Sequence, residues 1–354
     1  MLTLGQFKIK AMNRNILSVI VMSVSLLGAD AATRTVGIGK FSEIEVNGPV
    51  NVVFTQQKND GKAVVEGDDS DRVDNVVIES KNGVLRVDAK DKNKKSGTKF
   101  IGINVFNSVG DDDLATVTVS SPDMRSVKVN GSGKFTSENL SSTNLVLELN
   151  GSGDIDVRTV NVSALSAKVN GSGDLNIGKI KSTNVYVELD GSGDVDVDGI
   201  ESLASELYLN GSGDFIVKSL KANNATIGLK GSGDFKVREC DASSAVVNMK
   251  GSGDMEISGI VATVVTATLN GSGDMSLSGK SDSANLTLSR SGDLDAGSLV
   301  SRMVTAKVDG SGELVCHASE SVNTELDGSG SLTVKGNPKS ANNRGNKSYQ
   351  VEYE

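Results

Sequence analysis

Residues Leu189–Asp194 read LDGSGD, and residues Leu209–Asp214 read LNGSGD, the same turn twenty residues later. The motif GSG recurs with this period through the middle of the chain and continues, with a slipped period, toward the C-terminus. Its first glycines are Gly131, Gly151, Gly171, Gly191, Gly211, Gly231, Gly251, Gly271, Gly310 and Gly328, with a degenerate copy, Arg290-Ser291-Gly292, after Gly271. Self-similarity at a fixed period predicts a stacked repeat architecture.

Apolar residues stand at fixed places around each turn. The residue two places before the turn is aliphatic in every copy, as at Leu189 and Leu209, and the residue four places after it is apolar, as at Val195 and Phe215. Apolar and polar residues alternate within each copy, which is the period of a β-strand. Because no copy carries a second short return turn, the sequence predicts an all-β parallel β-helix formed by a single chain, with right-handed coils expected.

Polar columns support the same register. The residue before the turn is Asn or Asp in most copies, and both types tolerate turn conformations and can form stacked ladders. Lys128, Glu148, Lys168 and Glu188 alternate in sign on successive coils, so that stacking would place opposite charges side by side. With coils ~4.8 Å apart, eleven coils would make a rod about 50 Å long.

Four segments follow from this pattern. We expect residues 1–31 to form a signal peptide, residues 32–124 an N-terminal β region with a diverged coil and cap, residues 125–334 the GSGD-repeat β-helix, and residues 335–354 a polar C-terminal tail or cap. Within the second segment, Phe41–Phe54 resembles a shortened coil, and Val76–Val87 predicts a hairpin around Asn82-Gly83.

The N-terminus has the features of a secretory signal. Basic residues precede the apolar run Ile16–Gly28, and small residues follow at Ala29-Asp30-Ala31. The run is shorter than the roughly 20 residues that span a bilayer. We therefore expect an exported protein in the periplasm, on the cell surface or outside the cell, with no transmembrane segment in the mature chain; an uncleaved anchor is the alternative.

Composition limits the possible functions. A net charge of −9 argues against a nucleic-acid partner, which would require a basic face. The single histidine, His317, is expected outside the core and offers no metal site by itself. Cys240 and Cys316 fall on inward columns several coils apart, beyond the reach of a disulfide, and are predicted to be buried free thiols.

The clearest polar feature is a column of carboxylates after the turn, here called the aspartate column. Its members are Asp154, Asp174, Asp194, Asp214, Asp234, Asp254, Asp274 and Asp293. Stacked like charges repel, so something must offset the repulsion. One hypothesis is weak binding of Ca²⁺ between coils; the other is that each carboxylate accepts hydrogen bonds from the N–H groups and serine of its own turn.

Tyr186 and Tyr208 are the only tyrosines of the repeats, and adjacent coils would place them together in a small surface binding patch. A regular rod of this kind suits binding or cell-envelope architecture, with a glycan, an envelope component or a protein as partner. A polysaccharide-processing enzyme is the alternative, because β-helices also carry acid–base pairs, but such an enzyme would need a charged cluster at one coil. The sequence does not fix the oligomeric state.

Three stretches together resemble a known family. They are FSEIEVNGPVNVVFTQ (Phe41–Gln56), ATVTVSSPDMRSVKVNGSGKF (Ala115–Phe135) with the GSGD array that follows, and SLTVKGNPKS (Ser331–Ser340). They are similar to the head GIN domain family of auto-transporter adhesins. This resemblance covers nearly all of the mature chain and implies an exported β-helical protein that carries the label of an adhesin. The uniform repeat separately favours a non-catalytic function, and no cofactor is expected.

Overall fold

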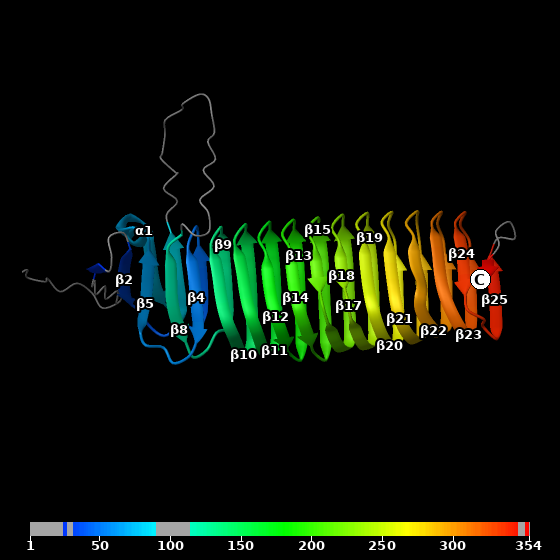
Figure 1. The fold of residues 1–354 in the computed structure, drawn as a ribbon, viewed down its shortest axis with the longest axis horizontal. Helices are drawn as coiled ribbons and strands as arrows, with labels where there is room; N and C mark the ends of the chain where they lie inside the picture. The colour runs from blue at the N-terminus through cyan, green and yellow to red at the C-terminus, as the bar shows by residue number, and fades with distance from the viewer. Residues whose placement is uncertain (1–23, 27–30, 90–113, 346–350, 354) are drawn as a thin grey trace, which may run out of the picture.

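The computed structural model describes residues 24–26, 31–89, 114–345 and 351–353. They form a long rod of stacked coils that run from the N-terminal end to the C-terminal end (Figure 1). The predicted signal peptide lies almost entirely outside the described residues, as do residues 90–113 of the N-terminal β region. The fold is a parallel β-solenoid of about 11 turns, which confirms the predicted class.

The N-terminal part contains the one helix among the described residues. Its elements are β1 (Val24–Leu26), β2 (Ala32–Gly37), β3 (Glu43–Asn47), β4 (Asn51–Gln56), β5 (Lys62–Gly67), α1 (Ser70–Asn75), β6 (Val76–Lys81), β7 (Val84–Ala89), β8 (Thr116–Ser121) and β9 (Ser126–Gly131).

The repeats and the C-terminal end follow. Their strands are β10 (Lys134–Gly151), β11 (Asp154–Gly171), β12 (Leu175–Lys181), β13 (Asn184–Gly191), β14 (Val195–Glu201), β15 (Ala204–Gly211), β16 (Phe215–Val217), β17 (Leu220–Gly231), β18 (Phe235–Val237), β19 (Cys240–Gly251), β20 (Met255–Leu269), β21 (Met275–Leu288), β22 (Leu294–Val308), β23 (Glu313–Leu326), β24 (Ser331–Lys335), β25 (Ser340–Gly345) and β26 (Val351–Tyr353).

Successive coils pair in parallel with a register of twenty residues. Gly151 of β10 lies opposite Gly171 of β11, and the same offset carries through β13, β15, β17 and β19. The slipped period near the C-terminus appears as register shifts between β20 and β21, β21 and β22, and β22 and β23. The chain absorbs each slip locally, because all of these strands remain paired in parallel.

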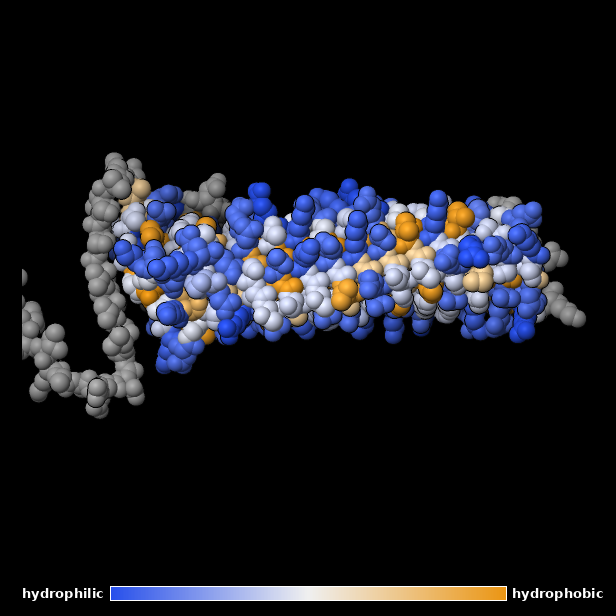
Figure 2. Space-filling model, turned by 90° about the horizontal axis from the view of Figure 1, so that it is seen from below, coloured by the Kyte–Doolittle hydropathy of each residue, from blue (hydrophilic) through white to orange (hydrophobic). Residues whose placement is uncertain are grey.

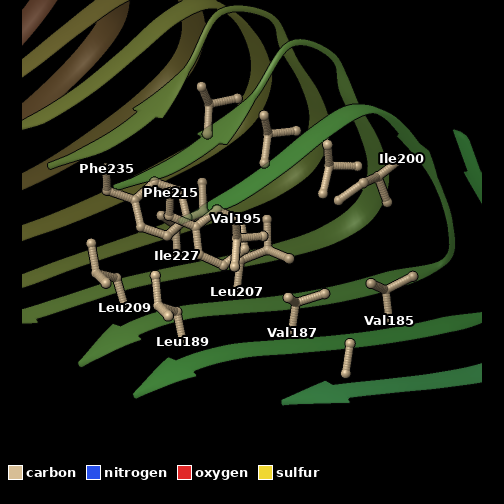
Figure 3. Close-up of a cluster of buried hydrophobic side chains, with 14 of the residues drawn as sticks. Val185, Val187, Leu189, Val195, Ile200, Leu207, Leu209, Phe215, Ile227 and Phe235 are labelled. Atoms are coloured by element: carbon tan, nitrogen blue, oxygen red, sulfur yellow. The ribbon is translucent and has the colours of Figure 1, made fainter. Parts of the chain in front are cut away.

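The core is a set of apolar columns that run along the rod. Side chains such as Leu189, Leu209, Phe215 and Phe235 point into the same interior from successive coils (Figure 3). The rings of Phe215 and Phe235 are stacked, with centroids 4.5 Å apart and planes 13° apart. Alternate residues face outward, so each strand buries one side only.

The Gly-Ser-Gly turns pack backbone against backbone. The N–H of Ser212 donates to the carbonyl of Gly191 one coil earlier, at 2.9 Å. A Cβ on Gly213 would lie 1.7 Å from the carbonyl oxygen of Gly193. The turns therefore repeat glycine because neighbouring coils approach too closely for any side chain at these points.

The first coils are stacked out of sequence order. β3 pairs in parallel with both β7 and β9, and β4 pairs in parallel with both β8 and β10. The coil of β3 and β4 thus lies between the coil of β7 and β8 and the first repeat, as the position of β4 between β8 and the following coils shows in Figure 1. The interpretation of Phe41–Phe54 as a diverged coil is confirmed, but its place in the stack is not sequential.

Both ends of the rod depart from the repeat. β6 and β7 form the predicted antiparallel hairpin, in which Asn82 and Gly83 both have positive φ. On the other sheet, β5 pairs antiparallel with β8, and β2 pairs antiparallel with β5. At the other end, β25 and β26 pair in parallel with β23 and β24, so that part of the polar segment after residue 334 continues the solenoid.

Candidate functional site

The aspartate column forms a hydrogen-bonded ladder between coils. The backbone N–H of Asp194 donates to Oδ1 of Asp174 at 2.9 Å, and that of Asp214 donates to Oδ1 of Asp194 at 2.9 Å. Equivalent bonds of 2.8–3.3 Å are donated by Asp174, Asp254, Asp274, Asp293 and Glu313. The hydrogen-bond hypothesis was therefore right about the type of contact but wrong about the donor, which belongs to the next coil.

One carboxylate of the column is distinct because of its environment. Burial is the main cause of the raised pKa of Asp154, while the N–H of Asp174 and the ammonium of Lys134 act in the opposite direction. Lys134 occupies the first place of the column, 3.8 Å from Asp154. Among the residues that the structure describes, no three His, Cys, Asp or Glu side chains are grouped so that they could hold a metal ion.

Calcium is therefore expected to leave the thermal stability of the protein unchanged. Oδ1 of the aspartates already accepts a backbone hydrogen bond. A folded-state ligand at 100 times its dissociation constant would add about 2.7 kcal/mol, enough for a clear upward shift of the melting temperature. Melts in excess calcium and in excess chelator test this, and a shift that Asp194→Asn abolishes would make the column a cation site.

The sheet that leads into each turn, here called the pre-turn sheet, carries a ladder of ion pairs on its outer face. The predicted pairs are present: Lys128 contacts Glu148 at 2.8 Å, and Lys168 contacts Glu188 at 3.0 Å. Glu45 aligns with Lys128, and Glu45 in turn pairs with Arg86 at 2.6 Å. The ladder thus extends through the out-of-order coils toward the N-terminal end.

The two repeat tyrosines lie next to one another at the end of this ladder. Their ring centroids are 5.8 Å apart, and the ring planes are tilted by 51°. The Tyr186 hydroxyl donates to Glu188 at 2.8 Å, and Lys168 lies 5.4 Å from the centroid of the Tyr186 ring. The sequence correctly predicted that the two side chains lie together. Tyr186 contacts the charged side chains of Glu188 and Lys168, whereas Tyr208 is the first of several uncharged residues in its column.

Tyr186 is expected to ionise only in strong alkali. Burial and the hydrogen bond to Glu188 raise its pKa from 10.0 to about 12. Because the folded-state pKa lies above the unfolded value, the stability that this group contributes is present below pH 10 and is lost as the pH rises toward 12. Phenolate absorbance of the native protein, compared with Tyr186→Phe, should show a missing titration near pH 12; one missing near pH 10 would contradict the contact.

A shallow groove lies beside Tyr208 on the pre-turn sheet. Its volume is about 360 Å³, and it is lined by Tyr208, Asn210, Gly228, Leu229, Lys230, Asn248, Met249, Lys250, Thr268 and Asn270. Sequence reasoning missed this groove. The available signal was the change from Asn or Asp to lysine at positions 230 and 250, which interrupts the column before the turn.

A second hollow lies on the sheet that follows the turn. It has a volume of about 610 Å³, and Gly178 lies between Arg158 and Asp198 in its lining. Asp156 and Asp196 also line it. Burial is the first cause of the raised pKa of Asp196, and the neighbouring Asp194 is the second.

The remaining candidate residues belong to the core or its margin. Cys240 and Cys316 are free and buried, as predicted. Burial raises the pKa of the Cys240 thiol to about 11 and that of Cys316 to about 12, so neither is a poised nucleophile. His317 aligns with Lys335 on the following coil, outside the innermost columns.

These features define a parallel β-solenoid that presents its polar side chains along shallow, open faces. The chain belongs to the family described as "Putative auto-transporter adhesin, head GIN domain", whose model matches residues 40–237, 176–261 and 225–338. The predicted family is confirmed. No curated protein matches the sequence.

The chain also has matches of low sequence identity among solved structures. A "putative adhesin" from Bacteroides fragilis is 17% identical, with 92% of this chain and 98% of that chain covered and a TM-score of 0.31. A "putative lipid binding protein" from Parabacteroides distasonis is 19% identical, with 92% and 97% covered and a TM-score of 0.28. A "putative adhesin" from Parabacteroides merdae is 16% identical, with 92% and 96% covered and a TM-score of 0.27. Within the described residues, no helix has the length and apolar character needed to cross a bilayer.

Proposed function

We propose that this chain is an exported, non-catalytic adhesion protein that binds an extended saccharide along part of its pre-turn sheet. The proposed surface, here called the neutral face, comprises Tyr208, Gly228, Asn248, Thr268 and Thr287, which align on five successive coils. Membership of the adhesin family and the signal-like N-terminus support export and adhesion.

The observation that carries the proposal is the interruption of the ion-pair ladder. Charged pairs occupy this column up to Glu188, which aligns with Tyr208 on the next coil. They resume at Lys307, which aligns with Thr287 and contacts Glu325 at 2.5 Å. Between these points the column is uncharged. The ion pairs on either side show that the stack accommodates charge here, so the neutral stretch is not a requirement of folding.

The chemistry of the neutral face suits a saccharide. Hydroxyl and amide side chains both donate and accept hydrogen bonds, as sugar hydroxyls do. The adjacent column adds further groups of the same kind at Thr226, Thr266, Asn285 and Thr305. Among the described residues, large exposed apolar side chains such as Leu203, Val261 and Met303 are few, and hydrophobic residues are scattered among hydrophilic ones on the face seen in Figure 2. A protein partner that docks through an apolar patch is therefore less well supported.

A glycan array with the mature chain tests the proposal. The decisive variant combines Asn248→Glu with Thr268→Lys, which extends the ion-pair ladder across the neutral face. Because the Lys168–Glu188 pair occupies the same column, the fold should accept it and binding should be lost. The control exchanges the exposed pair Lys181 and Glu201 on another face. Unchanged binding by the ladder variant, or no saccharide bound by the parent protein, would refute the proposal.

Polysaccharide processing is the second candidate, and the hollow around Asp196 favours it. A carboxyl with a raised pKa beside other carboxyls is the kind of group that acts as a general acid in glycoside cleavage. Release of reducing ends from bound polysaccharide that is abolished by Asp196→Asn would support this candidate. Saccharide binding without any such release would support adhesion.

A further inference from the structure

We infer that the groove beside Tyr208 binds an acidic saccharide unit, with the sugar ring on Tyr208 and its carboxylate or sulfate group between Lys230 and Lys250. This inference rests on the proposed function and specifies the ligand class of one part of the neutral face. Three independent features support it: a change from Asn or Asp to Lys in the column before the turn, two lysines that form no ion pair within the described part of the chain, and an aromatic ring that lies against a glycine of the next coil.

The first feature is the column that precedes the turn. Asn150 donates to Asn130 at 3.1 Å, and Asn170 donates to Asn150 at 3.0 Å, so this column is a ladder of side-chain amides in the early coils. Lys230 and Lys250 replace the amides on two adjacent coils, and Asn270 restores the amide on the next. The amide ladder itself ends before the lysines, because Asp190 follows Asn170 in this column and Asn210 donates to Glu188 at 3.0 Å. Lysine is not needed for the turn, because other coils form the same turn with Asn or Asp before it.

The second feature is the electrostatic state of these lysines. Other lysines of the pre-turn sheet are paired, as Lys168 is with Glu188 and Lys307 with Glu325. Within the described part of the chain, no carboxylate lies within 4.0 Å of Lys230 or Lys250, and both residues are exposed. They are in register on neighbouring coils, ~4.8 Å apart at the backbone. An anion between them would offset their mutual repulsion.

The third feature is the position of the Tyr208 ring. A Cβ on Gly228 would lie 2.6 Å from Cδ1 and 3.0 Å from Cε1 of Tyr208, so the ring rests directly on the backbone of the next coil. Its hydroxyl reaches Glu206 only at 3.4 Å, a weak hydrogen bond. Glycine at position 228 therefore leaves room for the Tyr208 ring in the lining of the groove, where its aromatic surface can pack against a sugar ring.

The three features meet in a single groove. Its lining contains both lysines, Tyr208 and several amide and hydroxyl groups, and it contains no carboxylate. The aspartate column lies on the other side of the Gly-Ser-Gly turn. In a chain with a net charge of −9, a groove lined by two cations and no anion has the charge complementary to an acidic ligand. The ring surface favours a sugar over a free inorganic anion.

Calorimetric titration of the mature protein tests the inference with matched ligands. Tetragalacturonate is compared with its methyl ester, and a chondroitin sulfate tetrasaccharide is compared with its desulfated form. We expect at least one acidic ligand to bind more tightly than its neutral counterpart, with an affinity that falls as NaCl is added, because exposed charges are screened.

Four variants assign the binding to the groove. Combining Lys230→Gln and Lys250→Gln should weaken acidic-ligand binding about tenfold or more and leave neutral-ligand binding unchanged. Tyr208→Ala and Gly228→Ala should weaken the binding of acidic and neutral ligands alike, because the alanine Cβ at position 228 would displace the Tyr208 ring. Tyr208→Phe should leave both affinities unchanged. Lys221→Gln, which removes an exposed lysine from another face, is the matched control. Melting temperatures confirm that each variant is folded.

Other outcomes separate this inference from the proposed function. Equal affinity for acidic and neutral ligands, or insensitivity to the double lysine substitution, would overturn the inference and leave saccharide binding intact. Binding of phosphatidylglycerol vesicles in the absence of oligosaccharide binding would replace the sugar with a lipid headgroup and overturn both. Failure to bind any saccharide would likewise overturn both the inference and the proposed function.

Discussion

Gly213→Ala is expected to be among the most damaging single substitutions in the rod. The new Cβ would lie 1.7 Å from the carbonyl oxygen and 2.8 Å from the carbonyl carbon of Gly193. Both are backbone atoms of the preceding coil, so no side-chain rotation can relieve the overlap. Because neighbouring coils are hydrogen-bonded at the turn, separating these two coils also breaks turn contacts such as that from the Ser212 N–H to the Gly191 carbonyl. We expect a loss of about 3 kcal/mol or more.

Gly199→Ala, within β14, is the matched control. The nearest atom to its Cβ would be the carbonyl oxygen of Ser219 at 4.0 Å, which is ordinary contact. Alanine there should be neutral or slightly stabilising, because it restricts the unfolded chain. Urea unfolding of both variants gives the comparison. Similar midpoints for Gly213→Ala and Gly199→Ala would show that the turn stacking is looser than described.

Phe215→Ala should cost about 3–5 kcal/mol, the range found for large aromatic truncations in cores. The side chain is fully buried and stacks on Phe235 at a centroid distance of 4.5 Å. Truncation would leave a cavity in mid-rod that cannot close, because the coils on either side hold their register through the turns. We expect hydrogen exchange to speed up first in β15–β19.

The neighbouring residue provides the control for Phe215→Ala. Ile216 belongs to the same strand, β16, but faces outward and is only partly buried. Ile216→Ala should cost less than about 1 kcal/mol, because it leaves no closed cavity. Equal losses for the two variants in denaturant unfolding would contradict the division of the coil into an inner and an outer row. Since a solenoid can unfold in segments, exchange and unfolding should be measured together.

The structure of the repeat region could be predicted closely because the period of the sequence determines the register between coils. A period of twenty fixes which residues stack, so Lys168 opposite Glu188 and Cys240 on the column of Leu220 and Ile260 follow directly. Alternation then fixes which side chains face inward, because a one-residue slip would expose every apolar side chain. No long-range information was needed beyond the repeat itself.

The order of the first coils could not be predicted in this way. Val46 could stack equally well on any coil with an aliphatic residue at that place, and the sequence carries no signal that it contacts Val87 on one side and Val129 on the other. Near the N-terminal end of the rod the repeat pattern is absent, so the period of twenty residues does not specify which strands pair there.

The candidate site was predicted in part. The approach of Tyr186 and Tyr208 followed from the register, as did the aspartate column, but the donor to each carboxylate depends on where a short side chain points across the gap between coils. The role of Gly228 was hidden, because its significance lies in the Tyr208 ring on the preceding coil. Such contacts depend on rotamers, which periodicity does not specify.

The out-of-order coil also sets the time course of assembly. β3 and β4 are synthesised before both of their neighbours, yet β4 must pair with β10 through Asn51 and Lys134, and with β8 through Asn51 and Thr116. As the chain emerges from the ribosome N-terminus first, this segment can pair with β7 and β8 on one side, but its other side stays unpaired until the first repeat has been made. Its contacts span a long loop and are slow to close, whereas each later repeat finds its template in the coil just completed. The junction between the β3–β4 coil and the first repeat therefore forms late. The later repeats can stack on their own first coil before this junction has formed.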